Sequence, residues 1–554
     1  MVTAGRLYIE TLGCQMNMLD SELVEGQLRR LGYETTPDIQ AADVVLINTC
    51  SVRDHAEQKA LSHLGALKKR KAKHPDTIVG VIGCMAERDP DGIVSKMPHV
   101  DLICGPGELN KVPAMIEEIR EHRTRAVALS QSLSRRSTPL QRALEYDSVE
   151  ALDLSRDPAP GAVLQAYIRV QRGCDKFCTF CVVPFTRGAE RSRPASSIVE
   201  EAKKLADRGC KEVTLVGQTV NSYVHQEDGR PVRFADLLER VNDVSGLERV
   251  RFVTSYPGDF TDDILDAMRE LPKVCEYLHL PAQSGSDAVL KRMRRMNTVS
   301  QYVELVERAR EKVPGITLAS DFIVGFCGET EDEFEDTVRL VERCRFKNLF
   351  VFKYSPRPGT VADKRLEDDV PEAVKRERNL RLLKFQERIS FEDNQKLIGR
   401  SFEVLVEGYS KAAIKAQESE QDRGCEVDRG CEADRGVGAG AAVKADTSGH
   451  APPARRPREI DLMAIGASSH RSFADAVAGA DWRTRVIPET RGDDEPPHSH
   501  VRPARDWRHA HQLVGRTRTD RIVVFPGAAN LIGALVNVRV HAATALTLHG
   551  EVSG

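Results

Sequence analysis

The strongest constraint on the fold is an alternation of short apolar, β-type runs with amphipathic helical patterns, which occurs in two series. In the first series we expect strands at 7–11, 44–48 and 78–82, separated by helices at 21–31 and 54–71. Strands joined through helices pair in parallel, because each helix returns the chain to the same end of the sheet. Residues 1–146 are therefore predicted to form an α/β domain with a doubly wound parallel sheet.

The second series follows a polar, proline-containing stretch at 147–161, which we interpret as a linker. Between residues 160 and 397, six β-type runs alternate with amphipathic helical segments. The runs lie at 164–170, 212–216, 250–253, 277–280, 316–321 and 349–354. Six consecutive β/α units predict a partial (βα)6 barrel, in which a functional site would lie at the carboxyl ends of the strands.

The C-terminal part is interrupted by sequence of low complexity. The pentapeptide Asp-Arg-Gly-Cys-Glu occurs at 422–426 and again at 428–432, and Gly/Ala-rich and Pro/Arg-rich sequence follows. We interpret 410–510 as a low-complexity insertion. The β-type runs on its two sides lie in 398–409 and 511–554, and together these segments are predicted to form a small β-barrel that the insertion splits.

Length and composition agree with a soluble protein of several domains. The chain has 554 residues, which is too long for one core, and 41% apolar and 29% charged residues are ordinary for globular proteins. Without a run of ~20 apolar residues or an apolar N-terminal stretch, we expect a cytoplasmic monomer with no membrane contact. A net charge of -3 gives no general attraction to nucleic acid, so RNA affinity would need local basic patches.

Thirteen cysteines without an export signal favour metal ligation over a disulfide framework. Cys174, Cys178 and Cys181 form a Cys-x3-Cys-x2-Cys motif just after the first strand of the second series. Three thiolates this close together can bind three irons of a 4Fe-4S cluster and leave the fourth iron open to a small molecule. The alternatives are a zinc site or a chance grouping, but structural zinc needs four ligands and no fourth Cys or His lies nearby.

A second set of cysteines is dispersed. Cys14, Cys50 and Cys84 each lie one to three residues beyond one of the first three strands. Because the carboxyl ends of parallel strands meet at one edge, we expect these thiols to converge and to bind a second cluster. The alternative is that they are buried apolar side chains, which is the usual fate of a single free cysteine. Six cysteines fit no ligand pattern: Cys104, Cys210, Cys275, Cys344, Cys425 and Cys431.

The Cys-x3-Cys-x2-Cys motif resembles that of the radical S-adenosylmethionine (SAM) superfamily, and the chain apart from the insertion resembles the methylthiotransferase family. The resemblance rests on the segments 13–17, 20–22, 48–53, 83–84, 173–188, 191–194, 217–221, 280–286 and 320–326. The split barrel resembles the family's TRAM domain, an RNA-binding module. Gln-Met-Asn after Cys14 resembles the branch that acts on isopentenyladenosine in tRNA. Sibling branches, which act on threonylcarbamoyl-adenosine or on a ribosomal-protein aspartate, are the alternative.

The resemblance implies conversion of N6-isopentenyladenosine at position 37 of tRNA to its 2-methylthio derivative, with two 4Fe-4S clusters and SAM. The clustered cysteines would hold the cluster that cleaves SAM to a 5′-deoxyadenosyl radical, and the dispersed cysteines would hold the cluster that carries the sulfur. Radical chemistry suits this reaction, because the C–H bond at carbon 2 is neither acidic nor polarised. The implied partners are the tRNA anticodon stem-loop and an electron donor such as flavodoxin or ferredoxin.

By the same analogy, SAM contacts are expected at the barrel mouth from Phe180, Gln218, Asn221, Gln283, Ser284 and Asp321. Such residues also serve as hydrogen-bond partners at strand ends, which is the alternative. A basic run of Arg187, Arg191 and Arg193 suits RNA phosphates, and Phe177 and Phe185 offer stacking surfaces. For the arginines the alternative is a loop with internal ion pairs.

The sequence departs from the family at two places. Cys327 stands where the family usually has proline in the turn 325–330, so the turn loses a φ constraint and gains a thiol near the barrel mouth. The insertion contains both tryptophans, and we interpret it as a surface loop that lets the barrel close. A rival from another class is a non-catalytic iron-sulfur RNA-binding protein, although an open iron argues against a purely structural cluster.

Overall fold

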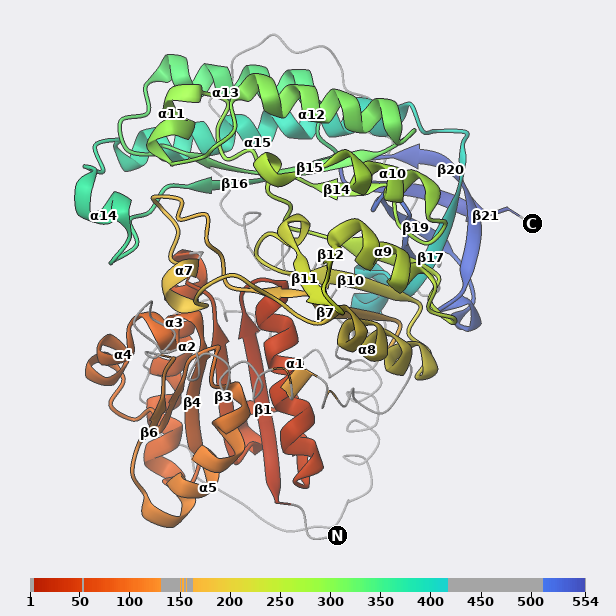
Figure 1. Ribbon diagram of the computed structural model, residues 1–554. Coiled ribbons are helices and arrows are strands. Elements are labelled where there is room, and N and C mark those ends of the chain that lie inside the picture. Colours follow the sequence, from red (N-terminus) through yellow and green to blue (C-terminus); the bar gives the residue numbers. More distant parts are fainter. Residues whose placement is uncertain are drawn as a thin grey trace, which may run out of the picture.

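The computed structural model describes residues 4–51, 54–130, 150, 152–153, 156, 163–416 and 512–553. Figure 1 shows an N-terminal α/β domain, a central open barrel above it and a small closed barrel at the C-terminal side. Nearly all of the expected insertion and most of the expected linker lie outside the described residues.

The N-terminal domain is a parallel sheet with strand order β2-β1-β3-β4-β5-β6, as the doubly wound prediction requires. The sequence reading missed the three short strands β2, β5 and β6. The strands are β1 (Gly5–Leu12), β2 (Tyr33–Thr35), β3 (Val44–Thr49), β4 (Ile78–Gly83), β5 (Leu102–Cys104) and β6 (Ala126–Ala128). The helices are α1 (Gln15–Arg30), α2 (Asp54–Lys73), α3 (Cys84–Arg88), α4 (Pro90–Lys96) and α5 (Val112–His122).

Both faces of this sheet are covered, and β3 shows why its sequence is apolar throughout. Val44 and Leu46 pack into the core shared with α1 and α5, whereas Val45 and Ile47 pack into the core shared with α2, α3 and α4. Successive side chains of a strand point to opposite faces, so a strand with helices on both sides carries no polar face.

The central domain contains six parallel strands in sequence order, which confirms the partial barrel. Two ladders, β7-β10-β13 and β14-β15-β16, are joined by a bridge between Val250 and Val274 and by the Ser255 N–H, which donates to the His279 carbonyl. The strands are β7 (Gln165–Arg169), β10 (Glu212–Val216), β13 (Arg249–Phe252), β14 (Tyr277–His279), β15 (Thr317–Val324) and β16 (Asn348–Lys353).

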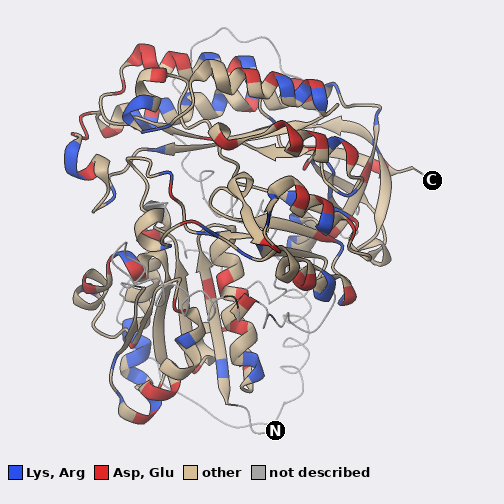
Figure 2. Ribbon diagram, viewed as in Figure 1, with Lys and Arg blue, Asp and Glu red and all other residues tan. Residues whose placement is uncertain are grey.

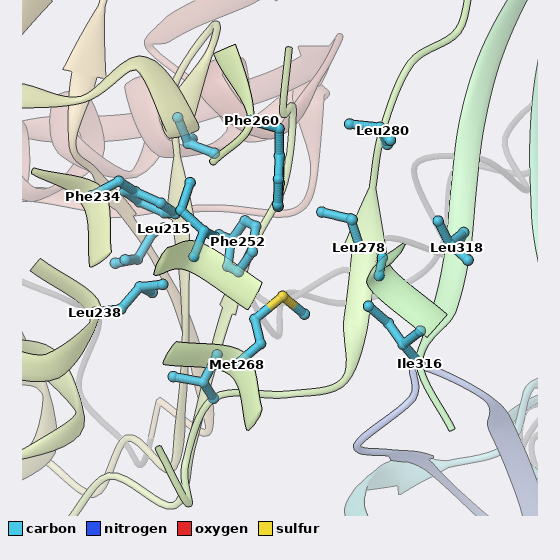
Figure 3. Close-up of a cluster of buried hydrophobic side chains, with 14 of the residues drawn as sticks. Leu215, Phe234, Leu238, Phe252, Phe260, Met268, Leu278, Leu280, Ile316 and Leu318 are labelled. Carbon is cyan, nitrogen blue, oxygen red and sulfur yellow. The ribbon is translucent and has the colours of Figure 1, made fainter. Parts of the chain in front are cut away.

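Helices flank the central sheet. They are α8 (Ala195–Asp207), α9 (Phe234–Asn242), α10 (Asp262–Glu270), α11 (Asp287–Arg292), α12 (Val299–Lys312), α13 (Glu331–Cys344), α14 (Val361–Arg365) and α15 (Glu372–Gln395). Figure 3 shows apolar side chains of β10, β13, β14 and β15 gathered with those of α9 and α10, including Phe234 and Phe252, whose rings lie 5.1 Å apart edge to face. Charged residues lie mainly on the outer helices, with both signs interspersed (Figure 2).

The C-terminal domain is a closed barrel of order β17-β18-β19-β21-β20, in agreement with the split-barrel prediction. Its strands are β17 (Ser401–Tyr409), β18 (Gln512–Thr517), β19 (Ile522–Pro526), β20 (Leu535–Ala543) and β21 (Thr547–Val552). Strands β17 and β18 are antiparallel neighbours, and the Ser410 N–H donates to the Gln512 carbonyl at 2.8 Å. Within the barrel, the segment that ends at residue 410 therefore pairs directly with the segment that begins at residue 512.

The closed barrel packs against the amino ends of the central strands. Arg249 and Arg251 donate to the carbonyls of Arg516 and Thr517, and the Lys347 ammonium lies 2.6 Å from the Asp520 carboxylate. The carboxyl ends of the central strands, where barrel sites are built, are left facing the N-terminal domain. None of the described helices combines the length and hydropathy needed to span a bilayer.

Candidate functional site

The dispersed cysteines follow three adjacent strands that end in register. Leu12 of β1 pairs with Thr49 of β3, and Thr49 pairs with Gly83 of β4. Cys14, Cys50 and Cys84 follow these three residues by two, one and one positions. The fold thus brings the three cysteines to one edge of the sheet, as the sequence predicted.

Gly83 allows this convergence. Its φ of +96° and ψ of -160° lie in a region that is essentially restricted to glycine, and a Cβ there would lie 2.6 Å from the Thr49 carbonyl oxygen. With glycine in place, β4 ends tightly against β3 and Cys84 begins α3. The requirement is steric, so any side chain at this position would push the two strand ends apart.

Asn17 links the Cys14 turn to the end of β3, a contact that the sequence reading, which used Asn17 only as part of the Gln-Met-Asn tripeptide, did not foresee. Its amide nitrogen donates to Asn48 Oδ1 at 2.9 Å and to the Thr49 carbonyl at 3.1 Å, while its Oδ1 lies 3.3 Å from Cys14 Sγ. The side chain is fully buried. Its position three residues after Cys14, in the first turn of α1, and its place in the Gln-Met-Asn tripeptide are the sequence signals for this role.

The dispersed thiols are shielded from water and lie beside an arginine from the other domain. Cys50 and Cys84 are buried and Cys14 is half-buried. Burial raises the pKa of the Cys84 thiol, and the nearby Arg187 guanidinium opposes this shift. Arg187 Nε donates to Cys84 Sγ at 3.3 Å. A positive charge beside a buried thiol favours its thiolate form, which is the form that binds metals.

The clustered cysteines lie on a loop that closes on itself after β7. Gly173 has a φ of +67°, and a Cβ there would overlap the Ala189 carbonyl. The Cys174 N–H donates to the Gly188 carbonyl at 3.2 Å, and β8 (Gln171–Arg172) pairs with β9 (Arg191–Ser192) at the base of the loop. The loop places Cys174, Cys178 and Cys181 at the carboxyl end of β7, which is the predicted position.

An arginine contacts this loop too. Arg295 Nη1 lies 3.8 Å from Cys178 Sγ, its Nη2 donates to the Pro281 carbonyl at 2.8 Å, and its guanidinium lies over the Tyr256 ring at 4.5 Å. Burial raises the pKa of the Cys174 thiol to about 11. Sequence reasoning missed Arg295, because it lies more than a hundred residues beyond the motif and only the fold brings it back.

The donor sets fit iron-sulfur clusters. Each site supplies three thiols and a contacting guanidinium, and one guanidinium nitrogen at each site, Arg187 Nη1 and Arg295 Nε, is buried with no hydrogen-bond partner among the described residues. In the part of the chain that the structure describes, no three His, Cys, Asp or Glu side chains form a group that could hold a single metal ion. Thiolates that bind different irons of one cluster need not converge on one point.

The six residues expected to contact SAM fall into two groups. Asn221 and Ser284 are buried, and their side chains have internal partners: Asn221 bonds both the N–H and the carbonyl of Tyr256, and Ser284 Oγ accepts from the Ser286 N–H. These two side chains fit the strand-end alternative. The other four lie near the carboxyl ends of the central strands or on the cysteine loop, namely Phe180, Gln218, Gln283 and Asp321.

The expectation that the basic run contacts RNA phosphates is wrong for two of its three members. Arg187 and Arg193 are only 6% and 1% exposed. Arg187 pairs with Asp20 at 2.8 Å, and Arg193 pairs with Glu150 and Glu201 at 2.7 and 2.8 Å. Internal ion pairs therefore account for both, because guanidinium groups that are buried in this way cannot reach a ligand in solvent.

A pocket of about 580 Å³ opens beside the clustered cysteines. Its lining includes Lys176, Phe177, Lys291, Arg294, Arg295 and Met296. Phe177 comes from the cysteine loop itself. Asp287 also lines the pocket and Lys176 is paired with Asp259, so the attraction for anionic ligands comes from Lys291, Arg294 and Arg295. Phe185 on α7 (Val183–Thr186) is 59% exposed, and Cys327 is buried with Phe326 and Tyr354.

Three family models match the chain, in the order of its three domains. Residues 6–105 match "Uncharacterized protein family UPF0004", residues 168–341 match the Radical SAM superfamily and residues 504–553 match the TRAM domain. A solved structure, the radical SAM methyltransferase TsrM from Kitasatospora setae, is similar with a TM-score of 0.44 and 15% identity, over 65% of this chain and 77% of that chain.

The central fold, the cysteine loop and the matching superfamily define the chain as a radical SAM protein. It belongs to the family of tRNA-2-methylthio-N(6)-dimethylallyladenosine synthases. The relative with this name from Rhodopirellula baltica is 51% identical over 411 residues, covering 74% of this chain and 85% of that protein. Those from Moorella thermoacetica and Syntrophotalea carbinolica are 46% and 42% identical and are each covered over 89% of their length. The non-catalytic alternative finds no support among these relatives.

Proposed function

We propose that the chain replaces the hydrogen on carbon 2 of N6-dimethylallyladenosine, also called isopentenyladenosine, in tRNA by a methylthio group, with SAM as a co-substrate. The observation that carries the proposal is the meeting of two three-cysteine sites across one domain boundary, in a chain of this family. One site follows β7 and the other follows β1, β3 and β4, and two neighbouring residues contact both: Arg187 donates to Cys84 Sγ, and the Gly188 carbonyl accepts from the Cys174 N–H.

In this proposal Cys174, Cys178 and Cys181 hold a 4Fe-4S cluster, and the dispersed cysteines hold a second, auxiliary cluster. When bound, such clusters supply the one-electron chemistry and the sulfur that replacement of an unactivated C–H bond requires. The chain's own contribution is to orient both sites and to shield the dispersed site from water, where Cys50 and Cys84 are buried. Asn17 fixes the strand ends at the auxiliary site, and the hydrogen bond from Cys174 to Gly188 closes the cysteine loop.

For SAM we propose contacts from Phe180, Gln218, Gln283 and Asp321. Asp321 Oδ1 lies 3.2 Å from His279 Nε2, so the carboxylate is held at the carboxyl end of the central sheet with a partner that orients it. Asn221 and Ser284 would act through the backbone that they fix rather than by direct contact.

The proposed tRNA partner is an anticodon stem-loop that carries the modified adenosine. Its target base would enter at the basic pocket beside Cys178, where Phe177 can stack on a base. The C-terminal barrel, which matches the TRAM domain, would contribute RNA contacts outside the site. A flavodoxin or ferredoxin would deliver the electrons, and we propose a monomer that works in the cytoplasm.

The test is to express the chain in a bacterium that lacks its own adenosine methylthiolating enzyme and to analyse digested tRNA by mass spectrometry. The expected result is 2-methylthio-isopentenyladenosine with the intact chain and unmodified isopentenyladenosine with Cys178→Ala. If isopentenyladenosine persists while the purified chain binds iron and cleaves SAM, the substrate assignment is wrong. A methylthio group on threonylcarbamoyl-adenosine, or on a ribosomal-protein aspartate, would identify the sibling activity instead.

A further inference from the structure

Arg187 crosses from the central domain into the N-terminal domain. It follows α7, six residues after Cys181, and α7 lies beside α3 at the carboxyl edge of the N-terminal sheet (Figure 1). Its side chain is 4% exposed. Nη2 donates to Asp20 Oδ2 at 2.8 Å, and Nε donates to Cys84 Sγ at 3.3 Å. The remaining nitrogen, Nη1, is buried and has no hydrogen-bond partner among the described residues.

Arg187 belongs to a buried network of ion pairs between the two domains. Asp20, which Arg187 contacts, is shared with Arg169, whose Nη1 lies 2.9 Å from Asp20 Oδ1. Arg172 is close by and donates to the Pro106 carbonyl. Burial, with the neighbouring Arg169, lowers the pKa of Arg172 to about 9. Asp153 offsets part of this charge through its ion pair with Arg169. Among the described residues, Arg187 therefore shares its carboxylate partner with a second guanidinium and has none of its own.

After Asp20, the acidic groups that act most strongly on Arg187 among the described residues are the thiols of Cys84 and Cys14. Thiolates that ligate a cluster are anionic, and hydrogen bonds to cluster sulfurs raise its reduction potential because the reduced cluster carries more negative charge. The buried N–H of Nη1 and the hydrogen bond from Nε to Cys84 therefore both fit a cluster bound at the dispersed cysteines.

We propose that Arg187 is a positioning residue for the auxiliary cluster: it donates to the Cys84 sulfur through Nε and to another sulfur of the bound cluster through Nη1, and so favours the cluster's reduced form. This inference rests on the proposed function, since it requires a cluster at Cys14, Cys50 and Cys84. The neighbouring Gly188 carbonyl accepts from Cys174, so one short segment orders both cysteine sites.

The test uses the full chain with Cys174, Cys178 and Cys181 all replaced by alanine, so that the auxiliary cluster is observed alone. After anaerobic reconstitution with iron and sulfide, the chain is titrated with dithionite and redox mediators, and the reduced cluster is counted by electron paramagnetic resonance. With Arg187→Gln we expect the ratio of reduced to oxidised cluster at a fixed solution potential to fall about tenfold, equivalent to ~59 mV for one electron. Arg187→Lys keeps the charge and is expected to restore part of the ratio.

Asp20→Asn separates an electrostatic role from structural damage. It breaks the same ion pair as Arg187→Gln but removes a negative charge, so we expect the ratio of reduced to oxidised cluster to rise. Arg156→Gln is the matched control, because Arg156 is also buried in an ion pair between the domains, with Glu22, and no cysteine is among its hydrogen-bond partners in the described part of the chain. This variant should leave the ratio unchanged.

The outcomes distinguish the inference from the proposed function. Shifts of the same sign in Arg187→Gln and Asp20→Asn, or an unchanged ratio in Arg187→Gln at full iron content, would overturn the role of Arg187 alone. If the chain without the three clustered cysteines binds no iron after reconstitution, no auxiliary cluster exists, and both the inference and the two-cluster proposal fail. If Arg187→Gln does not fold, the opposite shift of Asp20→Asn and the ratio in Arg187→Lys still decide.

Discussion

The two cysteine sites meet at one boundary but are built in different ways. The clustered site draws its three thiols from eight consecutive residues of one loop, whereas the dispersed site draws them from three strand ends spread over seventy residues of sequence. The loop is ordered by its own backbone hydrogen bonds and by the Thr179 N–H, which donates to the Met293 carbonyl. The dispersed site exists only when β1, β3 and β4 pair in register.

This difference teaches how much each site depends on tertiary structure. A local loop keeps its three donors on one segment when a distant contact is lost, because the donors are near neighbours in sequence. A site made from strand ends depends on the sheet and on the glycine and asparagine that close it. We therefore expect damage to the N-terminal domain to remove one cluster and spare the other.

The largest expected effect comes from the clustered site. Cys178→Ala removes one thiol and the contact of Arg295, so both SAM cleavage and methylthiolation of tRNA should fall to background. Iron analysis should show that the auxiliary site still loads. Cys344→Ala, a change at a buried cysteine at the end of α13, is the control and should retain both activities. Residual SAM cleavage in Cys178→Ala would contradict the assignment of this loop.

The dispersed site should behave differently when one thiol is removed. Cys50→Ala is expected to abolish methylthiolation while SAM is still cleaved to 5′-deoxyadenosine, because the clustered site is on another domain. Chromatography of the reaction products measures both. The matched control is Cys104→Ala, since Cys104 is also buried at the end of a strand of the same sheet. Equal loss of both reactions in Cys50→Ala would show that the two sites are not separable.

A smaller effect is expected at Gly83 and Gly173, where each substitution should affect only the cysteine site beside it. Gly83→Ala should lose auxiliary iron and Gly173→Ala should lose iron from the clustered site, because an added Cβ meets backbone oxygen in each case. The strained φ and ψ of Gly83 alone would cost an alanine ~1–3 kcal/mol. Gly315→Ala is the control, since Gly315 has a φ of +80° and nothing within 4 Å of the added Cβ. Iron content after reconstitution is the measurement, and full iron in both variants would contradict the steric argument.

The sequence predicted much of this architecture because its evidence is periodic. The six central strands and the positions of β1, β3 and β4 follow from apolar runs at regular spacing, and the expected ends of these runs lie close to the observed ones. The short strands β2, β5 and β6 have three residues each, so they carry too little periodicity to be read. The cysteine loop was readable because its ligands are neighbours in sequence.

What the sequence could not predict are contacts between residues far apart in the chain. Arg187 looks like a member of a basic surface run, and only the docked domains show that Asp20 and Cys84 enclose it. Arg295 gives no local signal for its contact with Cys178. Asn221 carries the polarity of a ligand-binding residue, yet the backbone of Tyr256 uses both ends of its amide.

The smallest expected effect is a pH dependence of stability in the N-terminal domain. Burial raises the pKa of Glu87, on α3 beside the dispersed site, to about 7, with the Ser130 N–H opposing and Glu108 adding to the shift. The unfolded chain releases this proton first, near its usual value of 4.5. The free energy of unfolding therefore falls as pH rises from about 4.5 through 7.

Glu87→Gln should remove this loss and stabilise the N-terminal sheet by ~1–3 kcal/mol at pH 8 relative to pH 5. Hydrogen exchange of the β4 and β5 amides in the full chain measures it, with Glu118→Gln on α5 as the control for loss of one carboxylate. If Glu87→Gln and Glu118→Gln show equal protection at both pH values, the ionisation of Glu87 does not contribute to the pH dependence of the free energy of unfolding.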